Sequence, residues 1–106
     1  MKTYELQAWG HKHDIYLEKT SYASGGGLAV QMWTVENGEL ADPWSNLTVN
    51  LDHEIAPDCA YIDTNNNGFE ICDWIMKNKI AEPTGGFGFS GFCSYPEFRF
   101  NMSAFE

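Results

Sequence analysis

The sequence predicts an α+β domain, with one antiparallel sheet of about five or six strands and a single helix packed on one face of that sheet. Three observations support this fold class. Short segments alternate apolar and polar residues, one segment near residue 70 has helical spacing, and turn-forming residues separate the segments. A chain of 106 residues has room for one core, so we expect a single domain over residues 1–106.

The first expected element is a β-hairpin over residues 4–18. Its two halves place apolar residues at period two on either side of a break at residues 10–13: Tyr4, Leu6 and Ala8, then Ile15 and Leu17. The next strand, over residues 28–35, is apolar on both faces and is therefore the candidate central strand. The pair Asn37-Gly38 then favours a tight turn, and a second hairpin follows with a longer connection to alternating residues 47–51.

A short strand over residues 59–62 precedes the expected helix. Asn67 is positioned to cap this helix, and Glu70, three residues later, is positioned to reach back in an arrangement like a capping box. The helix is expected to end at about Ile80. Its apolar face is expected to pack on the sheet and contains Ile71, Cys72, Ile75, Met76 and Ile80.

Residues 84–91 are expected to form a loop, followed by a last strand over residues 92–100. Pro96 cannot donate a hydrogen bond to a ladder, which places that strand at an edge or a bulge. Residues 86–91 spell G-x-G-x-x-G, but they follow a helix and precede a strand, the reverse of the order in a dinucleotide site. We therefore expect no dinucleotide cofactor.

The charge is concentrated in the middle of the chain. The formal net charge is −9, and residues 20–76 contain no Lys or Arg but hold nine acids: Glu36, Glu39, Asp42, Asp52, Glu54, Asp58, Asp63, Glu70 and Asp73. Such carboxylates disfavour direct binding of nucleic acid. Two interpretations remain open, a solvated acidic face and a surface that binds a basic protein.

Two further sets of residues are candidates for binding. Phe87 and Phe89 lie among glycines, and they either fill the core or form an exposed aromatic contact for a partner. The candidate ligands for zinc or another divalent metal are His11, His13, His53, Cys59 and Cys93. No zinc spacing is present, so buried thiols and exposed histidines explain the same residues without a metal.

The segment from Asp63 to Gly68 matches the first six positions of a calcium loop, but Trp74 stands where the bidentate carboxylate is required. An Asx-type turn that caps the following helix is the favoured interpretation.

No catalytic motif is visible, so we do not expect an enzyme. No apolar stretch approaches the roughly 20 residues that span a bilayer, and three cysteines are too few for a disulfide scaffold. We expect a cytoplasmic protein with free thiols.

Four segments resemble a family of small acidic proteins of unknown function that mobile elements and phages of Gram-positive bacteria carry: Leu28–Gln31, Pro43–Leu51, Cys59–Gly68 and Ser90–Phe98. The resemblance covers residues from about 20 to 100. It implies a counter-defence role in the bacterial host cytoplasm, and several anti-CRISPR proteins of this size are similar in composition.

The expected function is inhibition of a CRISPR effector nuclease, with a type II enzyme as the first expectation. The acidic residues would occupy the basic channels that hold guide and target. Two alternatives stay open: a metal-stabilised structural or regulatory domain of a mobile element, and an anti-restriction protein that imitates DNA.

Overall fold

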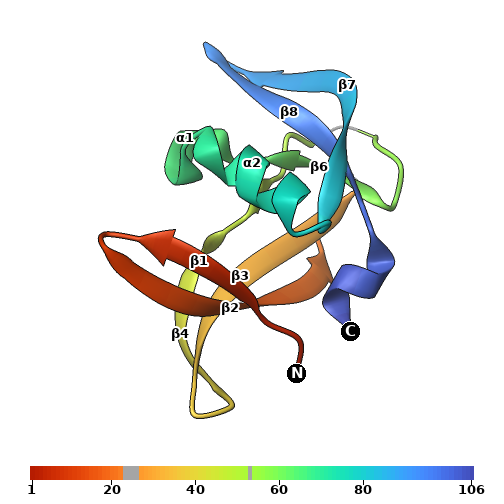
Figure 1. Cartoon of the computed structure of the whole chain (residues 1–106). Coiled ribbons are helices and arrows are strands. Elements are labelled where there is room, and N and C mark those ends of the chain that lie inside the picture. The colour runs from red at the N-terminus through yellow and green to blue at the C-terminus, as the bar shows by residue number, and fades with distance from the viewer. Residues whose placement is uncertain (23–26, 53) are drawn as a thin grey trace.

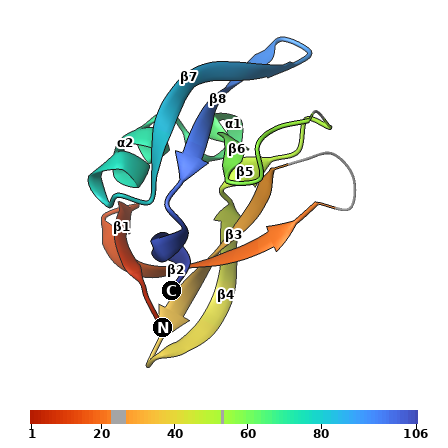
Figure 2. The same cartoon turned by 90° about the vertical axis from the view of Figure 1, so that its right-hand side faces the viewer.

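The computed structural model describes residues 1–22, 27–52 and 54–106. Its architecture is α+β, with two antiparallel sheets of four strands (Figures 1 and 2). The first sheet has the order β1-β2-β3-β4 and the second has the order β5-β6-β8-β7. The predicted class is therefore confirmed, whereas the prediction of one sheet with a single helix is wrong.

Strands β1 to β4 follow one another in space as they do in the chain, and their bounds are Tyr4–Ala8, His11–Ser21, Leu28–Glu36 and Glu39–Asn46. The β1–β2 hairpin is confirmed, and its turn lies at Trp9 and Gly10, which both have positive φ. The turn between β3 and β4 lies at Asn37 and Gly38, which also have positive φ, as predicted. Strand β3 pairs on both sides, as expected of a central strand.

The second sheet starts where the sequence predicts a single alternating strand. Strand β5 spans only Thr48–Val49 and pairs with β6, Cys59–Ile62. Leu47 lies between the two sheets, because its amide donates to the carbonyl of Val30 at 2.9 Å while its carbonyl accepts from the amide of Asp63 at 2.9 Å. The alternation at residues 47–51 therefore marks a crossing between sheets.

The helical segment is divided into two helices, α1 over Thr64–Asn67 and α2 over Glu70–Lys77. Asp63 caps α1, and Asn67 is its last residue, so the predicted cap at Asn67 is wrong. Gly68, which has a φ of 79°, ends α1 and prevents one continuous helix over the predicted range. Ile71, Ile75 and Ile80 are buried as predicted, whereas Met76 of the same predicted face is 41% exposed.

Residues 84–91 are not the expected loop, because most of them belong to β7, Ala81–Ser90. This strand pairs with β8, Cys93–Phe100, and the hairpin projects from the body of the protein in both views (Figures 1 and 2). Strand β8 is internal between β6 and β7, but its pairing with β6 ends at Glu97. Pro96 thus lies just beyond the last pair with β6, where β8 pairs only with β7.

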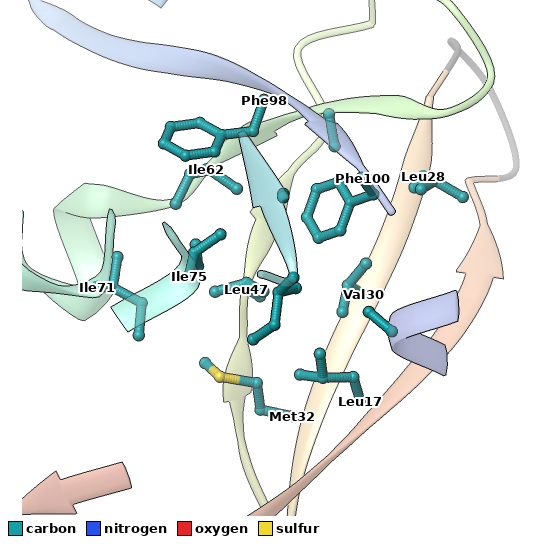
Figure 3. Packing of buried hydrophobic residues seen from close by; sticks show 14 of the residues in the cluster. Leu17, Leu28, Val30, Met32, Leu47, Ile62, Ile71, Ile75, Phe98 and Phe100 are labelled. Carbon is teal, nitrogen blue, oxygen red and sulfur yellow. The ribbon is translucent and has the colours of Figure 1, made fainter. Parts of the chain in front are cut away.

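The core lies between the two sheets and α2 (Figure 3). Leu17, Val30 and Met32 enter it from the first sheet, and Ile62, Phe98 and Phe100 enter it from the second. A 3₁₀ helix, Met102–Phe105, closes the chain, and the carbonyl of Ala104 accepts a hydrogen bond from the Tyr4 hydroxyl at 2.9 Å. Among the described residues, no helix is both long enough and apolar enough to cross a membrane.

Gly88 on β7 provides a test of how the β7–β8 hairpin joins the body. A Cβ at this position would lie 2.8 Å from Cε1 of Tyr61 and would also meet the Leu51 side chain. We expect Gly88→Val to lower the free energy of unfolding by about 1–3 kcal/mol through this overpacking. Thermal unfolding followed by circular dichroism measures it.

Gly91→Asn is the matched control, because a Cβ at Gly91 meets nothing within 4 Å and asparagine tolerates the φ of 59° there. We expect little change in its unfolding midpoint. If Gly88→Val and Gly91→Asn had the same midpoint, the packing of Tyr61 against β7 would be wrong.

Candidate functional site

The acidic residues of the 20–76 segment are mostly available to a partner. Seven of the nine are exposed: Glu36, Glu39, Asp42, Asp52, Glu54, Glu70 and Asp73. Asp58 is half-buried, and one of its carboxylate oxygens lies 3.5 Å from Nε of Arg99. Seven of the nine acids are thus exposed, whereas Asp58 and Asp63 are not freely exposed.

Asp63, one of the predicted partner residues, is buried in the structure. It is only 6% exposed, and its carboxylate accepts hydrogen bonds from the amide of Asn66 at 3.2 Å and from Nδ2 of Asn66 at 2.8 Å. It therefore caps α1 and is not part of the exposed acidic surface. The part of the favoured interpretation that places a helix cap in the calcium-like segment is confirmed at Asp63.

A groove of about 1280 Å³ lies between the first sheet and the two helices. Six carboxylates line it against only two ammonium groups, those of Lys12 and Lys77, which leaves a local net charge of −4; the acids are Glu5, Asp14, Glu36, Asp42, Glu70 and Asp73. Four of these are predicted partner residues. Glu39, Asp52 and Glu54 do not line the groove.

Side chains on both walls of the groove connect the helices to the first sheet. Nε1 of Trp74 on α2 donates to the carbonyl of Glu5 on β1 at 2.8 Å, and its ring meets that of Tyr4 edge to face at a centroid distance of 6.3 Å. At the other helix, Nδ2 of Asn67 donates to the carbonyl of Asn46 at 2.9 Å, and Oδ1 of Asn67 accepts from the hydroxyl of Ser45 at 2.8 Å. These contacts connect α2 to β1 and α1 to β4.

Three aromatic side chains form a cluster in the groove. The ring of Trp44 lies 5.2 Å from that of Trp9 and 4.7 Å from that of His13. Trp9 is 82% exposed although it is one of the largest apolar side chains, and it occupies a turn position with a φ of 51°. Nε2 of His13 is buried without a hydrogen-bond partner among the described residues.

Sequence reasoning missed Trp9, Glu5 and Asp14 as site residues. The first 19 residues sum to zero charge, so the acidic segment was expected to begin after them. Cross-strand pairing puts Glu5 opposite Asp14, and the β1–β2 hairpin contributes both to the groove. A tryptophan directly before the glycine of a predicted hairpin turn was the available signal for Trp9.

The β7–β8 hairpin carries the second candidate surface. Phe87 and Phe89, two residues apart on β7, are 58% and 67% exposed, which selects the exposed contact over the core position. Phe92 at the hairpin turn is fully exposed and was not predicted. This hairpin therefore presents three aromatic rings to solvent.

The candidate metal ligands do not come together in the described part of the chain, where no group of three His, Cys, Asp or Glu residues could hold a metal ion. His11 is exposed, whereas His13 packs on Trp44. Cys59 lies opposite Arg99, six residues along β8 from Cys93, which corresponds to roughly 20 Å. His53 lies outside the described residues.

The thiols at Cys59 and Cys72 are held in the protonated form. Burial raises the pKa of Cys59, and the adjacent Asp58 carboxylate raises it further. Burial likewise raises the pKa of Cys72, with a smaller contribution from Asp73. Because the thiolate is the nucleophile and the metal ligand, both shifts lower the reactivity of these cysteines near neutral pH.

Comparison with known proteins gives one match. Residues 16–106 match the model of DUF4313, described as a domain of unknown function. The match runs from β2 to the C-terminal 3₁₀ helix and does not include β1 or Trp9. No curated protein and no solved structure matches the chain.

Proposed function

Because this chain belongs to the DUF4313 family, whose function is unknown, we propose its function from its own surface: it is a counter-defence protein that binds and inhibits a CRISPR effector nuclease. The first target is a type II enzyme in the cytoplasm of a bacterial host. The proposal includes a phage or mobile element as the carrier of the protein. It requires no catalysis by this chain.

The observation that carries the proposal is the acidic groove. Six carboxylates and two ammonium groups line the groove. Four of the carboxylates belong to residues 20–76, a segment that contains no Lys or Arg. A nuclease that holds guide and target in a basic channel presents Lys and Arg side chains to phosphates. A carboxylate array with an open concave shape complements such a channel in charge.

The test uses guide-loaded type II effector nuclease and the purified protein. Co-elution on a sizing column is measured at 0.1 M and 1 M salt, followed by a DNA-cleavage assay on the same fractions. We expect co-elution with loss of cleavage at low salt and weaker binding at high salt, because the Debye length falls from about 10 Å to about 3 Å.

Two triple variants with the same change in net charge locate the contact. The groove variant is Glu36→Gln, Asp42→Asn and Glu70→Gln, and the control removes three exposed acids outside the groove, Glu39→Gln, Asp52→Asn and Glu54→Gln. We expect the groove variant to weaken inhibition about tenfold or more, at roughly 0.5–1 kcal/mol per contact, and the control less than threefold.

Each outcome decides between named alternatives. Equal losses for both triple variants would assign the effect to net charge alone and contradict a groove contact. Absence of co-elution and of inhibition would overturn the type II target. Inhibition of restriction endonucleases in a parallel panel would support the anti-restriction DNA mimic in its place.

A further inference from the structure

We propose that the Trp9–His13–Trp44 cluster in the groove is a recognition site for an arginine side chain of a protein partner. The inference deepens the proposed function, on which it rests for the identity of the partner. The site would recognise a protein surface by binding its arginine side chains, and peptide binding tests this without any nuclease.

The first argument is the placement of Trp9. A tryptophan that is 82% exposed is costly in solvent, and a φ of 51° is a conformation that bulky residues rarely adopt. Such strain and exposure at one residue are typical of binding sites. Since tryptophan is also a frequent hot-spot residue at interfaces, Trp9 is the expected anchor of the contact.

The second argument is the combination of aromatic faces with carboxylates. Trp9 and Trp44 lie 5.2 Å apart with their planes at 41°, and Asp42, two residues before Trp44, lines the same groove. A cation over the face of tryptophan is attracted to the ring, and a carboxylate next to it accepts hydrogen bonds from the cation. The groove therefore holds both aromatic faces and a carboxylate, the two kinds of group that bind a positively charged side chain.

The third argument distinguishes arginine from lysine. The guanidinium group is planar and weakly hydrated, stacks on aromatic rings and donates two parallel hydrogen bonds to a carboxylate, whereas an ammonium is compact and strongly hydrated. The buried Nε2 of His13, which has no described partner, is an additional polar atom in the cluster.

The experiment measures binding of two peptides by isothermal titration calorimetry in 0.15 M salt. One peptide alternates glycine with four arginines, and the other carries four lysines at the same positions. We expect the protein to bind the arginine peptide at least fivefold more tightly than the lysine peptide. We expect Trp9→Ala to remove that preference and to weaken arginine-peptide binding at least fivefold, with partial recovery in Trp9→Phe.

Phe92→Ala is the matched control, because it removes an exposed aromatic ring at the tip of the β7–β8 hairpin, outside the groove. Its affinity for the arginine peptide should equal that of the wild type. Equal affinity for both peptides, or no loss in Trp9→Ala, would overturn the inference and leave a purely electrostatic groove. Failure to bind the arginine peptide at millimolar concentration would also overturn it.

Two further outcomes separate this inference from the proposed function. If Trp9→Ala still inhibits a nuclease as well as the wild type, the arginine site is wrong while the inhibitor stands. If the wild type binds the arginine peptide through Trp9 but inhibits no nuclease, the inhibitor is wrong while the site stands. A dimer that Trp9→Ala dissociates would assign the cluster to a second copy of the chain and overturn the proposed occupant.

Discussion

Truncation of Phe98 to alanine is expected to lower the free energy of unfolding by about 3–5 kcal/mol, the range for a buried phenylalanine. Phe98 is 2% exposed and lies on β8, where it pairs with Ala60 on one side and with Pro83 on the other. Its ring packs in the core between the sheets (Figure 3). Urea unfolding followed by circular dichroism measures the loss.

Two variants make this result specific. Phe92→Ala makes the same chemical change at a fully exposed site and should stay within about 0.5 kcal/mol of the wild type. Phe98→Leu keeps most of the apolar volume and should cost less than about 1.5 kcal/mol, which preserves the test if the alanine variant does not fold. Similar losses for Phe98→Ala and Phe92→Ala would contradict this core.

The second large effect is expected at Trp74. Trp74→Ala removes the edge-to-face contact with Tyr4 and the hydrogen bond from Nε1 to the carbonyl of Glu5. Since the ring is only partly buried, we expect a loss of about 2–4 kcal/mol, somewhat below that of Phe98→Ala. This loss would separate α2 from β1 and so disturb the wall of the groove as well as the fold.

Trp74→Phe separates the two contributions, because it keeps an aromatic ring but cannot donate to Glu5; we expect it to cost about 0.5–1.5 kcal/mol. Trp9→Ala is the control for loss of an indole, and its 82% exposure predicts almost no change in stability. Circular dichroism is again the appropriate signal, since the variants alter fluorescence. Equal stabilities of Trp74→Ala and Trp9→Ala would show that α2 is not held by this contact.

Wherever local pattern and turn chemistry decide the outcome, the structure follows the sequence. The β1–β2 hairpin, the turn at Asn37-Gly38, the internal strand β3 and the short strand β6 are where periodicity and turn residues predict them, whereas the strand that pairs across the second turn is β4 and not the predicted residues 47–51. Strand alternation and left-handed turn residues act over a few neighbouring positions. These elements could therefore be predicted without knowing what packs against them.

Two of the errors arise because a local residue preference gives way to a partner elsewhere, in the adjacent strand for residues 85–91 and in a distant strand for Asn67. Glycines at residues 85–91 indicate a loop, but pairing with β8 supplies ladder hydrogen bonds over a segment that has few side chains to pack. Asn67 is a good helix cap in isolation, yet Asp63 caps α1 and Asn67 instead bonds to β4. Pairing between distant segments leaves no local signature.

The candidate site divides in the same way. Composition revealed the acidic segment and the phenylalanines among the glycines of residues 85–91, since charge and aromatic content can be counted, whereas their exposure came from the structure. Composition does not predict which acids line the same groove. Glu5 and Asp14 lie with Glu70 and Asp73 because α2 packs on β1. Asp63 shows the converse, since a carboxylate in the acidic run is buried as a helix cap.

The α+β class, the hairpin turns and the acidic surplus of this protein could be predicted from its sequence, because these features depend on residue type and on spacing over a few positions. The division of the strands into two sheets, the capping role of Asp63, and the contacts of both Trp9 and His13 with Trp44 in an acidic groove depend instead on how distant segments pack. The physical reason is that burial acts on surfaces brought together from distant parts of the chain. Each sheet buries its apolar face against the other sheet, α2 and the C-terminal 3₁₀ helix.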